Sequence, residues 1–101
     1  MTLDGIRRND FEQCVGEQFQ IELGGKVITA RLAAVTGLGF KSEGQQERES
    51  FTLLFHGPNQ YRYPQGIYRV SHPKLGSLEI FLVPLGPDEK GMQLEAVFNF
   101  V

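Results

Sequence analysis

The chain has 101 residues, 41% of them apolar, and its 10 basic and 12 acidic residues leave a net charge of −2. This length fits one small domain, and this apolar content excludes a disordered protein. Because the positive and negative charges are nearly equal in number, the composition gives no reason to expect binding to nucleic acid or to a membrane surface.

The cysteine count and the lack of long apolar runs indicate the cellular compartment. Cys14 is the only cysteine, so the chain can form neither an internal disulfide nor a cysteine-based zinc cluster. The start of the chain has no apolar run of the signal-peptide kind, and no later run is long enough to span a bilayer. We therefore expect a cytoplasmic protein without a membrane span, either free or built into a larger particle.

The N-terminal part of the chain predicts one short helix. Residues 1–8 carry too little apolar pattern to be placed, so we expect a flexible N-terminus followed by a single β domain over residues 9–101. Asn9 is a good N-cap, and Glu12 stands three residues later, as in a capping box. These signals predict a helix over residues 10–15.

From residue 18 onward the apolar residues recur with a period of two, which is typical of strands. Glycines 24 and 25 predict a tight hairpin between the first two strands, and Pro84 is expected to end or bulge the fifth. The predicted strands cover residues 18–23, 26–35, 50–57, 67–72, 75–88 and 92–100. About six strands without long helices between them predict an antiparallel all-β domain, either a small barrel or a strongly curled sheet.

The second predicted strand and the segment after it differ in pattern. Alternation predicts that Leu32 and Ala34 face the core and that Val35 faces the other way. Residues 36–49 are polar, contain glycines and have no period, so we predict a long loop there.

The fifth predicted strand is apolar on both of its faces. Leu78, Ile80 and Leu82 point one way, while Phe81 and Val83 point the other. Something must therefore cover Phe81 and Val83.

The short helix is the favoured cover for part of this second face. It carries Phe11, Cys14 and Val15 on one side and is too short to be stable alone, so it must dock on a surface. Leu54 and Val97, outward on two other strands, add to the apolar excess. A patch of this kind that stays uncovered usually marks a contact surface.

Residues that could carry chemistry are few. His56 and His72 each stand where a strand meets a turn, and a histidine there usually caps backbone groups; a zinc site would need further ligands. Cys14 could be a nucleophile only if one of these histidines came within reach, and we interpret it as a small buried hydrophobe. We predict no catalytic residue, no metal site and no cofactor.

The segment over residues 59–69 interleaves tyrosines with arginines, a composition common in recognition hot spots. Ordinary packing of a turn is the leading interpretation of this segment, and protein contact is the second. Nucleic acid is disfavoured because the chain has no basic surplus. The candidate interface residues are Leu54, Tyr61, Tyr63, Phe81, Val83 and Val97.

Three stretches, "SFTLLFHGP", "PQGIYRVSHPKLGSLEIFLVPLGPD" and "LEAVFNF", together resemble an uncharacterised bacterial family of small β domains. The likeness covers nearly all of residues 11–100. Relatives tend to be encoded beside phage-tail-like proteins, so the resemblance implies a tail-associated or particle-assembly role. It implies no catalytic residues.

We therefore expect a non-catalytic structural or assembly domain that binds a protein partner or associates with itself. The alternative is a small ligand- or peptide-binding β-barrel module that uses residues 37–49 and the tyrosine-rich turn as the rims of a pocket. An enzyme would show itself as His56 and His72 converging with a carboxylate or with Cys14.

Overall fold

The computed structural model of the protein describes residues 5–41 and 49–100, with the backbone alone described at residues 40 and 41. In this part of the chain one helix precedes six strands. The elements are α1 (Arg8–Glu12), β1 (Gln18–Leu23), β2 (Lys26–Lys41), β3 (Glu49–Gly57), β4 (Gly66–His72), β5 (Gly76–Asp88) and β6 (Gly91–Phe98). No helix in the described ranges is long and apolar enough to cross a membrane.

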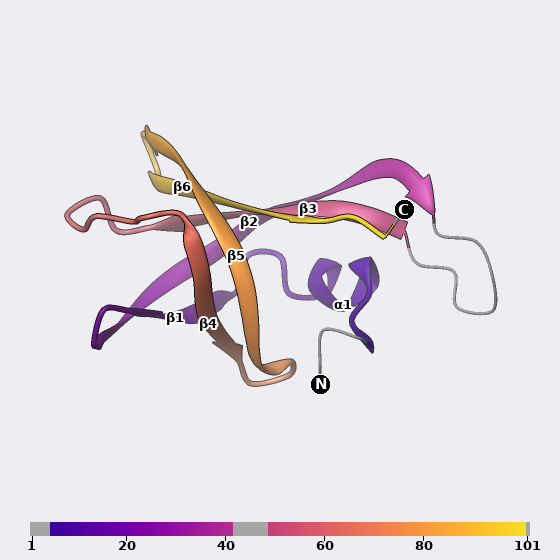
Figure 1. The fold of residues 1–101 in the computed structure, drawn as a ribbon, viewed down its shortest axis with the longest axis horizontal. Coiled ribbons are helices and arrows are strands. Elements are labelled where there is room, and N and C mark those ends of the chain that lie inside the picture. Colours follow the sequence, from indigo (N-terminus) through magenta and orange to yellow (C-terminus); the bar gives the residue numbers. More distant parts are fainter. Residues whose placement is uncertain (1–4, 42–48, 101) are drawn as a thin grey trace.

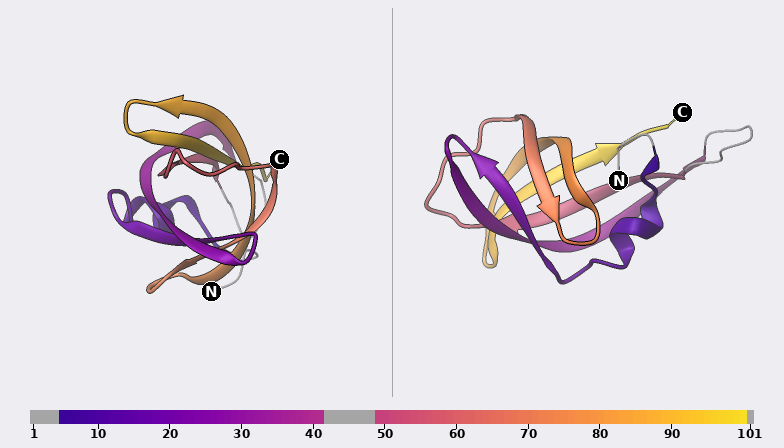
Figure 2. Two further views of the ribbon diagram at one scale, coloured as in Figure 1. Left: turned by 90° about the vertical axis from the view of Figure 1, so that its left-hand side faces the viewer. Right: turned by 90° about the horizontal axis from the view of Figure 1, so that it is seen from below.

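The six strands form one closed ring in the order β1-β2-β3-β6-β5-β4, and every neighbouring pair is antiparallel. Figure 1 labels the strands, and the left view of Figure 2 shows the ring close to end-on. The predicted all-β class is confirmed, and the sheet is a barrel.

Local sequence signals place the first hairpin and the irregular part of β5. Gly24 and Gly25 both have positive φ, 53° and 86°, which the tight turn between β1 and β2 requires. On β5 the pairing with β6 shifts between Pro84 and Gly86, so the strand bulges after the proline as predicted.

Phenylalanine rings fill much of the barrel interior. Phe19 on β1 meets Phe55 on β3 edge-on, with ring centroids 5.2 Å apart. Phe51 stacks on Phe98 at 4.8 Å. Such pairs add to the stabilisation that burial of the rings provides.

The helix begins earlier than predicted. Its N-cap is Arg7, whose backbone N–H donates to Oδ2 of Asp10 at 2.8 Å. Asp10 therefore plays the role that the sequence suggested for Glu12, and the helix ends at Glu12. Ile6 is already buried in the core, so the chain packs before residue 9, and only residues 1–4 of the predicted flexible N-terminus lie outside the described residues.

α1 does not cover the outer face of β5, and this prediction was wrong. The helix contacts β2 and β3 and lies beneath the part of these strands that extends beyond the ring (Figures 1 and 2). Phe11 is fully buried there, with its ring 5.8 Å from Phe51 and 5.6 Å from Phe98. The helix closes one end of the barrel core, while Val15, in the turn after the helix, is 45% exposed.

A β-bulge reverses the two faces of β2 at Ala33. Leu32 pairs with Phe55, but Ala34 pairs with Leu54, so one residue of β2 has no partner on β3. As a result Ala34 lies on the outside of the sheet next to Leu54, and Val35 packs against the core. The sequence had predicted the opposite faces for Ala34 and Val35, because strict alternation does not reveal an inserted residue.

β2 also runs farther than predicted. The loop expected over residues 36–49 is strand as far as Lys41, since Thr36 pairs with Thr52 and Gly37 with Phe51. Pairing with β3 outweighs the weak strand preference of this polar, glycine-bearing segment. Residues 42–48 of the predicted loop lie outside the described residues.

The buried position of Phe11 gives a direct test of how the helix docks. Phe11→Ala should lower the free energy of unfolding by about 3–5 kcal/mol, because it leaves a cavity between three aromatic rings. Val15→Ala, at a partly exposed position just after the helix, should change it by less than about 0.5 kcal/mol. Urea unfolding of both variants measures the difference, and equal effects would contradict the docking of Phe11 in the core.

Candidate functional site

Apolar side chains gather on the outside of β4, β5 and β6. Phe81 is 51% exposed, and its ladder partner Ile67 on β4 is 70% exposed. Val97 on β6 is 57% exposed. Val83 and Leu54, on β5 and β3, are half-buried on the same side. We call Leu54, Ile67, Phe81, Val83 and Val97 the outer face; it contains four of the predicted interface residues and adds Ile67.

Two carboxylates stand on this side of the barrel, and one of them, Glu79 beside Phe81, is paired with Arg69. Glu95 on β6 pairs with Val83 on one side and with Leu54 on the other. Within the described part of the chain Glu95 has neither an ion pair nor a side-chain hydrogen bond. The outer face therefore combines exposed hydrocarbon with one uncompensated negative charge, a combination suited to an apolar surface that carries a cation.

The two predicted interface tyrosines have different roles. Tyr63 is buried, and its hydroxyl donates to the carbonyl oxygen of Pro58 at 2.6 Å. Burial, and then the neighbouring Tyr61 and Tyr68, raise the pKa of Tyr63 to about 12. Tyr63 thus holds its own turn together and is not available for contact.

Tyr61 is half-buried and borders a shallow depression. Lys26 Nζ lies 4.9 Å from the centre of its ring, and Met92 and Pro84 line the depression with it. This turn lies at one end of the molecule, whereas the ends of β2 and β3 at Lys41 and Glu49 lie at the other (Figure 1). The described part of residues 37–49 therefore does not lie beside the tyrosine-rich turn; residues 42–48 of that predicted rim lie outside the described residues.

The two histidines are far from converging on one site. His56 Nε2–H donates to Asp88 Oδ2 at 2.8 Å, and Asp88 Oδ1 accepts from the backbone N–H groups of Lys90 and Gly91. The hydrogen bond from His56, followed by that from Lys90, lowers the pKa of Asp88. His56 therefore fixes the β5–β6 turn.

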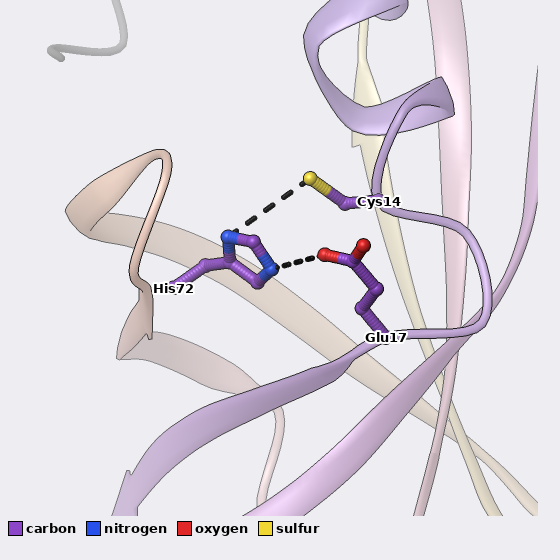
Figure 3. A group of neighbouring side chains, drawn as sticks. All are labelled: Cys14, Glu17 and His72. Carbon is purple, nitrogen blue, oxygen red and sulfur yellow. Dashed lines mark hydrogen bonds and ion pairs between the residues drawn. The ribbon is translucent and has the colours of Figure 1, made fainter.

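His72 does meet Cys14 and a carboxylate (Figure 3). Its Nε2–H donates to Glu17 Oε1 at 2.7 Å, and the Cys14 sulfur lies 3.9 Å from Nδ1. The backbone N–H of Lys74 donates to the same Nδ1 at 3.1 Å, so Nδ1 holds the lone pair and Nε2 the proton. The ring also packs on Phe19, with centroids 4.6 Å apart.

This cluster meets the condition stated for Cys14 as a nucleophile, a histidine within reach, but not the one stated for an enzyme, because His56 lies apart and pairs with Asp88. The sequence did not predict the cluster itself. A thiol, an imidazole and a carboxylate in line is a geometry used in nucleophilic catalysis. However, Cys14 is only 1% exposed. Burial, and then the charge of Glu17, raise the pKa of Cys14, so the thiol stays protonated and lacks the thiolate that attacks substrates.

A family model described as a domain of unknown function, DUF6916, matches residues 6–98. The chain belongs to this family. The match includes all six strands and the Cys14, Glu17 and His72 cluster of this DUF6916 domain, and it confirms the predicted resemblance to a family of uncharacterised small domains. No curated protein and no solved structure matches the chain. The function of the DUF6916 domain must therefore be inferred from its own surface and clusters.

The lowered pKa of Asp88 predicts a dependence of stability on pH. A carboxyl with a lowered folded pKa stabilises the fold while it is ionised, and this contribution is lost as the pH falls from the unfolded value of 3.8 through the folded one. Asp88→Asn should therefore destabilise the protein near neutral pH and lose less stability than the wild type on acidification below that value. Urea unfolding across this range measures both, with Glu89→Gln as the control from the same turn. Parallel pH profiles for wild type and Asp88→Asn would contradict the role of the His56 pair.

Proposed function

We propose that the domain is a non-catalytic assembly module that binds another protein through its outer face. The observation that carries this proposal is the exposure of Ile67 and Phe81, which are ladder partners on β4 and β5, together with the exposure of Val97 on β6. Large apolar side chains that lie together in water are unfavourable unless a partner covers them. The enclosure of the only thiol beneath α1 supports a role without catalysis.

Glu95 defines the chemistry of the partner. In a symmetric pair centred on Glu95, the two Glu95 carboxylates would approach each other, and such a like-charge contact is unfavourable. Arg69, the exposed cation on the same side of β4, is already paired with Glu22 and Glu79. An unlike surface with an apolar strip and one lysine or arginine would cover the same residues and neutralise Glu95. We therefore infer a partner protein of that kind, in preference to a second copy of this chain.

The resemblance to bacterial domains encoded beside phage-tail-like proteins supports a more specific form of the proposal. The partner would be a component of a tail-like particle, and the domain would join it in the cytoplasm during assembly. A small domain with a net charge of −2 and one apolar side suits such a role, because its attachment needs only one side of the barrel.

Phe81→Asp and Glu95→Lys test this proposal against the control Val27→Asp. Val27 is exposed on β2, away from the outer face. Purified tail-like particles from the native cell are mixed with each variant and sedimented. We expect Phe81→Asp to weaken binding about 30-fold or more, as for a residue at the centre of an interface, and Glu95→Lys to weaken it with a reduced dependence on salt.

Light scattering on the free domain completes this test. A monomeric wild type that binds particles supports an unlike partner. A stable wild-type dimer that Phe81→Asp dissociates would show that the outer face joins two copies and would overturn the inference drawn from Glu95. Equal sedimentation of Phe81→Asp and Val27→Asp would overturn the outer face as the binding surface.

A further inference from the structure

We propose that Cys14, Glu17 and His72 form a binding site for a divalent metal ion, for which zinc is the best match. Sulfur, imidazole nitrogen and carboxylate oxygen are the three donor types that zinc takes from proteins. One donor atom from each residue lies within 4.8 Å of the other two. Such a mixed donor set, with two of the three residues buried, differs from an exposed acidic cluster.

The sulfur and Nδ1 are already close to the positions that a metal requires. Their separation is 3.9 Å, whereas two donors at zinc bond lengths in a tetrahedral site are about 3.6 Å apart. Nδ1 carries its lone pair, because Lys74 N–H donates to it, so no change of tautomer is needed. Metal binding exchanges that hydrogen bond for a metal–nitrogen bond.

Glu17 is the donor that must move. Its side chain is 41% exposed and has three rotatable bonds, while Cys14 and His72 are held by the core. Turning from Nε2–H of His72 toward the thiol brings the carboxylate onto the metal. Water can supply a fourth ligand, because His72 borders a shallow surface depression together with Gln20 and Pro73.

Charge also favours the ion. Binding of a divalent ion releases the thiol proton of Cys14 to solvent, because the ligand is the thiolate. The thiolate and the Glu17 carboxylate, beside a neutral imidazole, then carry two negative charges, which the ion balances.

The position of the cluster suggests what the metal does. Glu17 immediately precedes β1, and His72 is the last residue of β4. These two strands close the ring, and in the described part of the chain they pair only at Gln20–Ser71 and Ile21–Val70. An ion held by both sides would fasten the ring where its hydrogen-bonded ladder is shortest, and would tie the turn after α1 to it.

The first experiment titrates the full chain with zinc alone and then with cobalt(II) as a spectroscopic probe. Because Cys14 is the only cysteine, a sulfur-to-cobalt charge-transfer band reports on this thiolate without any mutation. We also expect zinc to shift the backbone amide resonance of Lys74 and to raise the unfolding temperature, since a ligand that binds only the folded state stabilises it. The lack of a charge-transfer band at saturating cobalt would overturn the proposal.

Variants assign the ligands. Glu17→Gln, at a partly exposed position that should tolerate the change, should weaken zinc binding about 10–100-fold, and Cys14→Ser should weaken it further. His56→Gln is the matched control, because His56 also pairs with a carboxylate but has no thiol nearby. If Cys14→Ser does not fold, the zinc affinity of Glu17→Gln and the cobalt spectrum of the wild type still decide whether these residues bind the metal. Equal zinc affinity in Glu17→Gln, His56→Gln and the wild type would overturn the site.

Discussion

Closure of the sheet is the constraint from which the rest of this structure follows. In a ring of strands nearly every side chain faces either the interior or the outside, and few strand edges remain open. The interior of a six-stranded ring is narrow, and phenylalanine rings from β1 and β3 occupy it. The end of this core must still be sealed, and Phe11 of α1 does so. The one short helix described is therefore committed to that end and leaves the outer face bare.

Much of the fold could be predicted because alternation is a local property. The two sides of β5 could be read directly from Leu78 to Val83, and the diglycine specified the first turn. The bulge at Ala33 could not be predicted, because an inserted residue leaves no mark in a run of small apolar side chains. The extension of β2 to Lys41 depends on its pairing with β3, which no local signal in residues 36–41 indicates.

The two candidate sites also differ in how far the sequence predicts them. Four of the five residues of the outer face could be predicted, because they are apolar on the side of their strands that alternation assigns to solvent; Ile67 was missed. The cluster of Cys14, Glu17 and His72 could not be predicted, because Cys14 and His72 meet only when β4 lies beside β1. The order of strands in the sheet is not visible in the sequence. The placement of Glu17 three residues after Cys14, immediately before the first strand, was the available signal. Tyr63 shows the reverse error, since a tyrosine suited to recognition is used to hold a turn.

The outer face also affects how free molecules behave in solution. Its exposed hydrocarbon creates attraction between molecules at any concentration, and the net charge of −2 provides little repulsion to oppose it. The solubility of the isolated domain therefore depends on the balance between hydrophobic attraction at the outer face and weak electrostatic repulsion between molecules. Adding salt shifts that balance toward precipitation, and a bound partner removes the attraction at its source.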